Sequence, residues 1–107
     1  MKKLLLATAC ALAIVACSNG ANQYVGHWVN VKDAKDTMVI KENGSTLLIT
    51  DTSPDPLSGA MDTENFPGVI KDRLLQVQAP MGTTSFVIDK STGHLNAGGD
   101  EYKRLSK

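Results

Sequence analysis

The part of this chain expected to fold contains no cysteine. The 107-residue sequence has two cysteines, Cys10 and Cys17, and both lie within its first seventeen residues. A domain without cysteine forms no disulfide bond and offers no thiolate to zinc, so core packing alone must stabilise it. Small size limits that packing, because a domain of about 90 residues buries only about 60–65% of its unfolded surface.

The chain also lacks an excess of charge of one sign. It carries 11 Lys and Arg residues against 11 Asp and Glu residues. Without Lys2 and Lys3 at the N-terminus, nine basic residues remain against eleven acidic ones, a net charge of −2. The remaining basic residues are scattered along the sequence. Because nucleic-acid binding requires a clustered basic excess, we expect no nucleic-acid partner.

No apolar run is long enough for a stable membrane-spanning helix. The longest, Leu4 to Val15, has twelve residues and is interrupted only by Thr8, whereas a spanning helix needs about 20. Two lysines precede the run, and Ala16 and Cys17 follow it. A positive N-terminus, a short apolar run and a small residue before a cleavage point are typical of a secretory signal peptide.

The string Ile14-Val15-Ala16-Cys17 resembles the lipobox of bacterial lipoproteins. The resemblance implies that residues 1–16 are removed, that a diacylglyceryl group is attached to the sulfur of Cys17, and that its new amine receives an acyl chain such as palmitate. Two or three acyl chains anchor a protein stably to a membrane. By the enterobacterial sorting rule, Ser18 favours the periplasmic face of the outer membrane. The alternatives are an ordinary secretory signal cleaved near Ala16, or a buried helix.

Residues 17–23 are predicted to be a lipidated N-terminus followed by a flexible tether. The six residues from Ser18 to Gln23 are small or polar and have no periodicity. As a flexible coil, six residues span roughly 13 Å. We therefore expect the folded domain, residues 24–107, to lie close to the membrane surface.

From Tyr24 onward the sequence consists of short β-prone runs separated by turn residues. Asn43-Gly44 is the strongest hairpin signal, because both residues tolerate a positive φ. Seven or eight short strands with tight turns predict an all-β antiparallel meander, and exposed edges favour its closure into a curled sheet or small barrel. The predicted core is Trp28, Val31, Met38, Ile40, Leu47, Ile49, Val69, Leu75, Val77, Phe86, Ile88, Leu95 and Leu105.

Gly26-His27-Trp28, in the first expected strand, resembles the Gly-x-Trp motif of lipocalin-like barrels. In that family the tryptophan closes one end of the barrel, and a basic residue near the last strand packs on it. The resemblance implies that Arg104 stacks on Trp28 through a cation–π contact. The alternative is that Trp28 is simply the largest residue of the core.

Asp51 to Asn65 is predicted to be a long irregular loop, because it contains Pro54, Pro56 and Gly59. Phe66 to Lys71 would follow as a short edge strand, since Pro67 cannot donate to a β-ladder. The carboxylates of the loop do not have the spacing of an EF-hand, so a solvated acidic loop is expected rather than a calcium site. The candidate partner-binding residues are Asp51, Asp55, Asp62, Glu64 and Phe66.

No motif in the sequence predicts catalysis or metal binding. His27 and His94 are the only histidines, and a zinc site needs three or four ligands. No serine lies in a Gly-x-Ser-x-Gly turn, and Gly98-Gly99 is too short to hold a phosphate. We therefore expect a protein that is not an enzyme, with no catalytic residues, no metal and no cofactor beyond the lipid on Cys17.

Three functions are consistent with these features. The first is a lipid-anchored envelope protein that binds a protein partner through the Asp51–Asn65 segment. The second is a protective inhibitor, immunity or exclusion lipoprotein that blocks a hydrolase, toxin, phage or conjugating donor. The chain resembles lysozyme-inhibitor lipoproteins in size and β content. The third is a carrier of a small apolar ligand, which would require a continuous apolar pocket.

Overall fold

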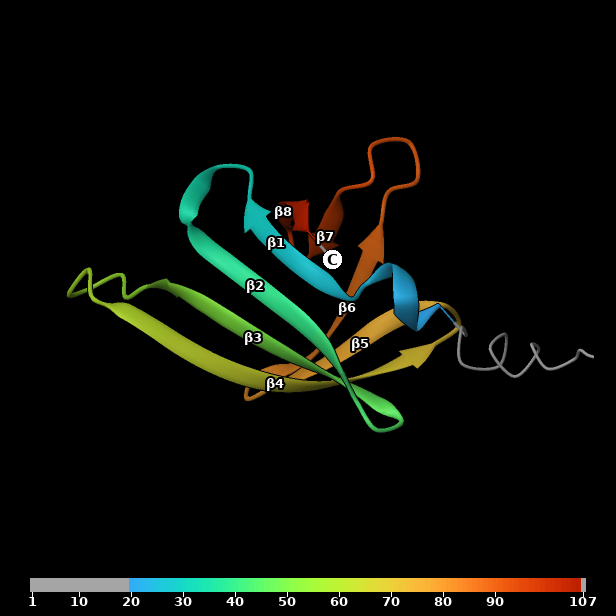
Figure 1. The fold of residues 1–107 in the computed structure, drawn as a ribbon. Helices are drawn as coiled ribbons and strands as arrows, with labels where there is room; N and C mark the ends of the chain where they lie inside the picture. Colours follow the sequence, from blue (N-terminus) through green and yellow to red (C-terminus); the bar gives the residue numbers. More distant parts are fainter. Residues whose placement is uncertain (1–19, 107) are drawn as a thin grey trace, which may run out of the picture.

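The computed structural model describes residues 20–106, and the predicted signal peptide and Cys17 lie outside them. Eight antiparallel strands form a closed barrel in which each strand pairs with the next and β8 pairs with β1 (Figure 1). This confirms the predicted all-β meander and its closure. The strands are β1 (Gly26–Asn30), β2 (Asp33–Asn43), β3 (Thr46–Pro54), β4 (Met61–Lys71), β5 (Leu74–Ala79), β6 (Gly82–Ile88), β7 (Leu95–Ala97) and β8 (Asp100–Ser106).

The connections between strands alternate between the two ends of the barrel. One end, which we call the capped end, carries the 3-10 helix η2 (Ala21–Gln23) and the connections at residues 44–45, 72–73 and 89–94. The other end, which we call the mouth, carries the connections at residues 31–32, 55–60, 80–81 and 98–99. In Figure 1 the tip of the β3–β4 hairpin and η2 lie on opposite sides of the molecule. No helix within residues 20–106 is long and apolar enough to cross a membrane.

The predicted β2–β3 hairpin is present, with its turn displaced by one residue. Asn43 pairs with Thr46, so the two-residue turn consists of Gly44 and Ser45. Gly44 has a φ of 66°, and a positive φ at the first turn residue is typical of a type II′ turn. The turn between β4 and β5 has a positive φ at both Asp72 and Arg73 (56° and 68°), the pattern of a type I′ turn.

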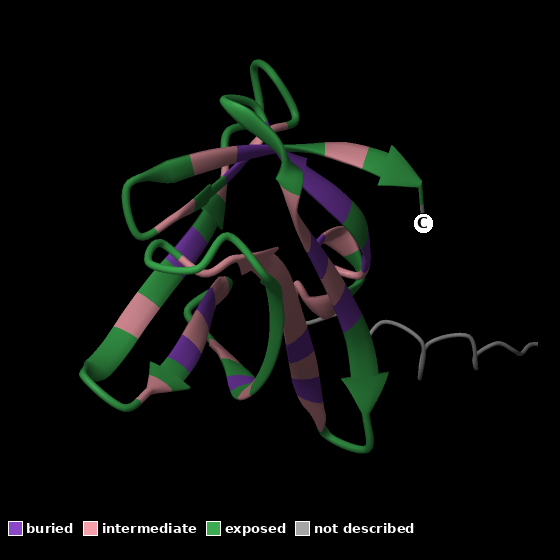
Figure 2. Ribbon diagram, turned by 90° about the vertical axis from the view of Figure 1, so that its left-hand side faces the viewer, coloured by how far each residue is buried: buried purple, intermediate pink, exposed green. Residues whose placement is uncertain are grey.

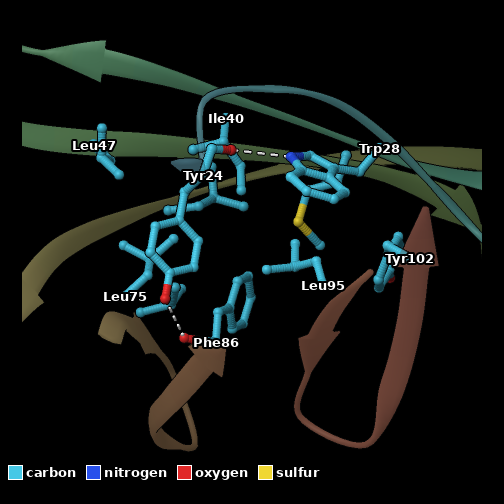
Figure 3. Packing of buried hydrophobic residues seen from close by; sticks show 11 residues of the cluster. Tyr24, Trp28, Ile40, Leu47, Leu75, Phe86, Leu95 and Tyr102 are labelled. Atoms are coloured by element: carbon cyan, nitrogen blue, oxygen red, sulfur yellow. Dashed lines mark hydrogen bonds between the residues drawn. The ribbon is translucent and has the colours of Figure 1, made fainter. Parts of the chain in front are cut away.

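Large apolar side chains fill the capped half of the barrel (Figure 3). Trp28, Ile40, Leu75 and Leu95 are completely buried. Tyr24, which follows η2, covers this cluster, and its hydroxyl lies 2.9 Å from the carbonyl oxygen of Arg73 and 3.1 Å from that of Phe86. Figure 2 shows buried residues separated by intermediate or exposed ones along several strands, as expected when successive side chains point to opposite faces.

Part of the predicted core is wrong. Val31, Val69 and Leu105 are 41%, 43% and 60% exposed. Val31 lies in the β1–β2 turn, while Val69 and Leu105 neighbour the inward positions of their strands and therefore point outward. Ile88 is only partly buried against the core. The buried hydrophobic residues that the sequence reasoning missed are Tyr24, Val29 and Tyr102, and the polar Asn30 is buried as well.

The prediction of a long irregular loop from Asp51 to Asn65 is also wrong, because only residues 55–60 connect the strands. Strand β3 continues to Pro54, which pairs with Met61 at the start of β4. Outward threonines support this extended hairpin: Thr50 bonds to Asn65 (2.7 Å) and Thr52 to Thr63 (3.0 Å). Cross-strand pairs of this kind stabilise a sheet even where proline and glycine lie nearby.

The short edge strand expected from Phe66 to Lys71 is likewise wrong. It forms the second half of β4, which pairs with β3 from Met61 to Gly68 and with β5 from Gly68 to Lys71. Pro67 lies just before the β5 pairing begins, so its missing N–H removes no hydrogen bond on that side.

The predicted tether is shorter than expected, because Ala21–Gln23 form η2 at the capped end. Two guanidinium bonds from Arg104 hold this segment, one from Nη2 to the Gln23 carbonyl oxygen (2.5 Å) and one from Nη1 to that of Val25 (2.7 Å). The same guanidinium stacks on Trp28, 4.3 Å from the ring centroid, which confirms the expected cation–π contact. The indole Nε1 donates to the Tyr24 carbonyl oxygen (3.0 Å). The last strand thereby locks the N-terminal segment over the core.

Candidate functional site

The mouth half of the barrel contains a cavity of about 260 Å³. Several wall positions carry small side chains, namely Ala79, Thr84 and Ala97. Larger side chains at these positions would fill the space that forms the cavity. The rest of the wall is mostly apolar or aromatic: Met38, Ile49, Phe66, Val77, Phe86 and Tyr102. Since an apolar cavity of about 150 Å³ holds benzene, this one has room for roughly ten non-hydrogen atoms.

Two carboxyl groups meet at one side of this cavity. Asp51 lies in the wall, at the inward position of β3 that follows Leu47 and Ile49. Asp36 lies on the neighbouring strand β2, where its Oδ2 accepts hydrogen bonds from Asn30 Nδ2 (2.9 Å) and the Tyr102 hydroxyl (2.7 Å). The Oδ1 atoms of Asp36 and Asp51 are both buried and have no hydrogen-bond partner.

Burial raises the pKa of the Asp51 carboxyl group to about 7. Asp36 raises it further through a hydrogen bond and its charge, and the charges of Glu64 and Asp100 add smaller effects. A nearby negative charge and burial both disfavour the ionised form of a carboxyl group. The structure therefore places a carboxyl group with a raised pKa, that of Asp51, in the wall of a mostly apolar cavity.

Tyr102 connects this pair to the aromatic part of the wall. Burial raises the pKa of its phenol, and the hydrogen bond to Asp36 raises it further. The phenol therefore remains protonated at all ordinary pH values and donates to Oδ2 of Asp36. Asn30 donates to the same oxygen, so these two bonds hold the Asp36 side chain in place.

The structure brings together three of the five predicted site residues. Asp51 and Phe66 line the cavity, and Glu64 pairs with Asp51 across the β3–β4 ladder. Asp55 instead stabilises the tip of the hairpin, where its Oδ1 accepts hydrogen bonds from two backbone N–H groups of the same turn. Asp62 is exposed on β4 and does not line the cavity.

Sequence reasoning missed Asp36, Asp100 and Tyr102 as members of this site. A signal was present in the alternation of inward residues, because Asp36 precedes Met38 and Ile40 at a spacing of two, and Asp51 follows Leu47 and Ile49 at the same spacing. A carboxylate that continues an inward apolar stripe is expected to point into the barrel.

The two histidines lie away from the cavity wall. His27 is exposed on β1, and His94, at the start of β7, bonds through Nδ1 to Oε2 of Glu101. Across residues 20–106, no three His, Cys, Asp or Glu side chains are placed so that they could hold a metal ion.

No family model, no curated protein and no solved structure matches this chain. The chemistry of the site must therefore be inferred from its own residues. Its apolar wall favours burial of an uncharged, water-avoiding group. The carboxyl group of Asp51 accepts hydrogen bonds at one position of this wall. An apolar wall with a polar group at one defined position is typical of a small-molecule binding pocket.

Proposed function

We propose that this protein is a lipid-anchored, non-enzymatic protein of the bacterial envelope that binds a small ligand in the mouth of its barrel. The observation that supports this function best is the cavity of about 260 Å³. Its wall offers apolar and aromatic side chains together with the carboxyl group of Asp51. A concave, mostly apolar surface with a few polar groups is typical of a small-molecule site.

The end at which the chain enters the barrel supports attachment through a lipid at Cys17. The described chain enters the barrel at the capped end, at Gly20, three residues after Cys17. Three residues reach at most about 11 Å. A lipid on Cys17 would therefore hold the capped end near the membrane and direct the mouth toward the aqueous compartment. Ser18 favours the periplasmic face of the outer membrane for this arrangement.

Lipidation is tested by replacing the cysteine. Cells grown with labelled palmitate are expected to incorporate label into the wild-type protein, whereas Cys17→Ser should incorporate none, because the thiol that receives the diacylglyceryl group is missing. Mass spectrometry of the wild-type N-terminus should show a modified Cys17. Cys10→Ser is the matched control and should retain the label, since this cysteine lies within the segment that is removed. Loss of the label in Cys10→Ser but not in Cys17→Ser would contradict lipidation of Cys17.

Ligand binding is tested by filling the cavity. Ala97→Leu adds three carbon atoms to a wall residue of β7, and we expect it to weaken binding of the neutral aromatic probe phenylpropanol by about tenfold or more, because that volume is then lost to the ligand. Calorimetric titration measures the change. Asn96→Leu, which adds the same side chain at the neighbouring exposed position, should leave the affinity unchanged. Equal affinities for wild type and Ala97→Leu would exclude the cavity as the binding site.

Binding of a protein partner at the mouth is the second candidate function. Leu57 and Met81, at the tips of two mouth connections, are 97% and 99% exposed. Apolar side chains exposed to this degree are frequent at protein-binding surfaces, although single ones also occur on ordinary surfaces. This function would gain support if the wild-type protein bound no small probe while a protein partner protected both side chains from solvent.

A further inference from the structure

We propose that the ligand of the mouth cavity is an organic cation, in which an ammonium or guanidinium group is attached to a compact apolar body. This inference rests on the proposed ligand-binding function and deepens it by naming the chemical class of the ligand. Three observations support it: the carboxyl group of Asp51 in the cavity wall, the composition of that wall and the charge around the mouth.

The first observation is the carboxyl group in the cavity wall. Asp51 lines the cavity, and no basic side chain is among the residues of the wall. A bound molecule therefore meets an unpaired carboxyl group in a wall that is otherwise mostly apolar. An ammonium group has three hydrogen-bond donors and a guanidinium group five, and both carry the charge opposite to that of a carboxylate. A hydroxyl has one donor, and a carboxylate has none.

The second observation is the composition of the cavity wall. Phe66, Phe86 and Tyr102 contribute three aromatic rings, and aromatic rings attract ammonium and guanidinium groups through their negative faces. The wall away from Asp51 is aliphatic, with Met38, Ile49 and Val77 among its residues. Such a wall suits a ligand with a charged head and an apolar body of roughly ten non-hydrogen atoms in total.

The third observation is the charge around the mouth. Asp36 on β2, Glu64 on β4 and Asp100 on β8 all act on Asp51 with negative charge, while the wall residues contributed by β5, β6 and β7 are uncharged. The lysines on the neighbouring segments, Lys35 and Lys41 on β2 and Lys103 on β8, are all exposed and are absent from the cavity wall. A site surrounded by negative groups attracts cations and repels anions.

Cation binding at this site depends on pH in a defined direction. A cation binds the ionised form of the Asp51 carboxyl group more tightly than the protonated form. Because the pKa of Asp51 is raised to about 7, the ionised form predominates only above that pH. Affinity for an amine should therefore increase as the pH rises through neutrality, whereas affinity for a neutral ligand should not.

The test uses three probes with the same phenylpropyl body and different head groups: phenylpropylamine, phenylpropanol and phenylpropanoate. The full chain, reconstituted in lipid nanodiscs, is titrated by calorimetry, and empty nanodiscs correct for partition of each probe into lipid. Near pH 8 we expect the amine to bind about tenfold more tightly than the alcohol, as a charge-assisted hydrogen bond predicts, and the anion to bind most weakly. At about pH 5.5, below the raised pKa of the Asp51 carboxyl group, this preference should largely disappear.

Asp51→Asn should abolish the preference for the amine while leaving affinity for the alcohol unchanged. Asp62→Asn, which removes an exposed carboxylate from the same hairpin, is the matched control and should retain the preference. A thermal melt checks that each variant is folded. If Asp51→Asn does not fold, Asp100→Asn at the exposed part of the wall is expected to weaken amine binding about two- to threefold without affecting the alcohol.

The possible results distinguish this inference from the function on which it rests. A preference for the amine that is lost in Asp51→Asn supports both. Equal binding of amine and alcohol, with both weakened by Ala97→Leu, overturns the cation inference and leaves small-ligand binding in place. If no probe binds, small-ligand binding is itself overturned. Binding of a lysine-rich peptide without binding of any probe overturns both and favours the mouth as a protein-docking surface.

Discussion

Replacing Trp28 with alanine is expected to lower the free energy of unfolding by about 3–5 kcal/mol, the range found for large aromatic residues in packed cores. The indole is completely buried and connects three parts of the capped end. Its Nε1 bonds to the Tyr24 carbonyl oxygen (3.0 Å), and its ring supports the Arg104 guanidinium at 4.3 Å. Small domains have a total stability of only about 5–15 kcal/mol, so this change should leave the protein only marginally folded.

Urea unfolding followed by circular dichroism measures this effect, because Trp28 is the only tryptophan and its fluorescence is lost in the variant. His27→Ala is the matched control, since His27 is the exposed neighbour on the same strand, and we expect a change within about 0.5 kcal/mol. The loss of unfolding free energy in Trp28→Phe should lie between those of Trp28→Ala and His27→Ala. This variant retains a ring beneath Arg104 but loses the hydrogen bond of the indole N–H. A loss below about 1 kcal/mol for Trp28→Ala would show that the capped end does not depend on the indole.

The stability of the barrel is expected to contain a contribution that falls as the pH rises from about 4 to about 8. The carboxyl group of Asp51 has an ordinary pKa of 3.8, which the fold raises to about 7 through burial and the negative groups around it. Between these values the folded state holds a proton that the unfolded state has released. The stabilising contribution is therefore complete below about pH 4 and is lost as the pH passes about 7. Because Asp51 is only partly buried, we expect about 1–2 kcal/mol, well below the value for a fully buried group.

Asp51→Asn isolates this contribution, because the amide has the same shape and does not ionise. We expect this variant to be more stable than the wild type by about 1–2 kcal/mol near pH 8 and to differ little from it near pH 4. Asp62→Asn, at an exposed position of β4, should follow the wild-type profile. Urea midpoints recorded across the pH range provide the comparison, and parallel profiles for wild type and Asp51→Asn would contradict the raised pKa.

The two results expected for Asp51→Asn point in opposite directions. The variant should gain stability near neutral pH and lose its selectivity for a cation. A side chain that lowers stability while it provides a binding contact is typical of a functional residue, because binding sites hold charges that a purely structural core would exclude. Measuring both quantities on one preparation shows whether Asp51 belongs to this class.

The amino-acid sequence by itself determined the class of the fold. Period-two alternation and turn residues such as Gly44 are local signals, and they predict an antiparallel meander without knowledge of distant contacts. The same alternation correctly predicted most of the inward apolar residues, including Ile40, Leu47 and Leu75. The lipobox at Cys17 is also a purely local signal, and it remains a prediction because it lies outside residues 20–106.

Local signals failed where the decisive interactions join distant parts of the chain. The segment from Asp51 to Asn65 has loop-like composition, yet cross-strand threonine pairs continue β3 and β4 through most of it. Likewise, Val69 and Leu105 are as apolar as the true core residues, and only the strand register shows that they point outward.

The candidate site was decided almost entirely by the tertiary structure. Asp36 and the Tyr102 hydroxyl to which it bonds are 66 positions apart in the sequence, and they meet only because closure of the barrel brings the last strand back to the first. The cavity depends on the combined volumes of side chains from β2 through β8, which no single stretch of sequence specifies. Without closure, the carboxyl groups of Asp36 and Asp51 would be solvated and no cavity would lie beside Asp51.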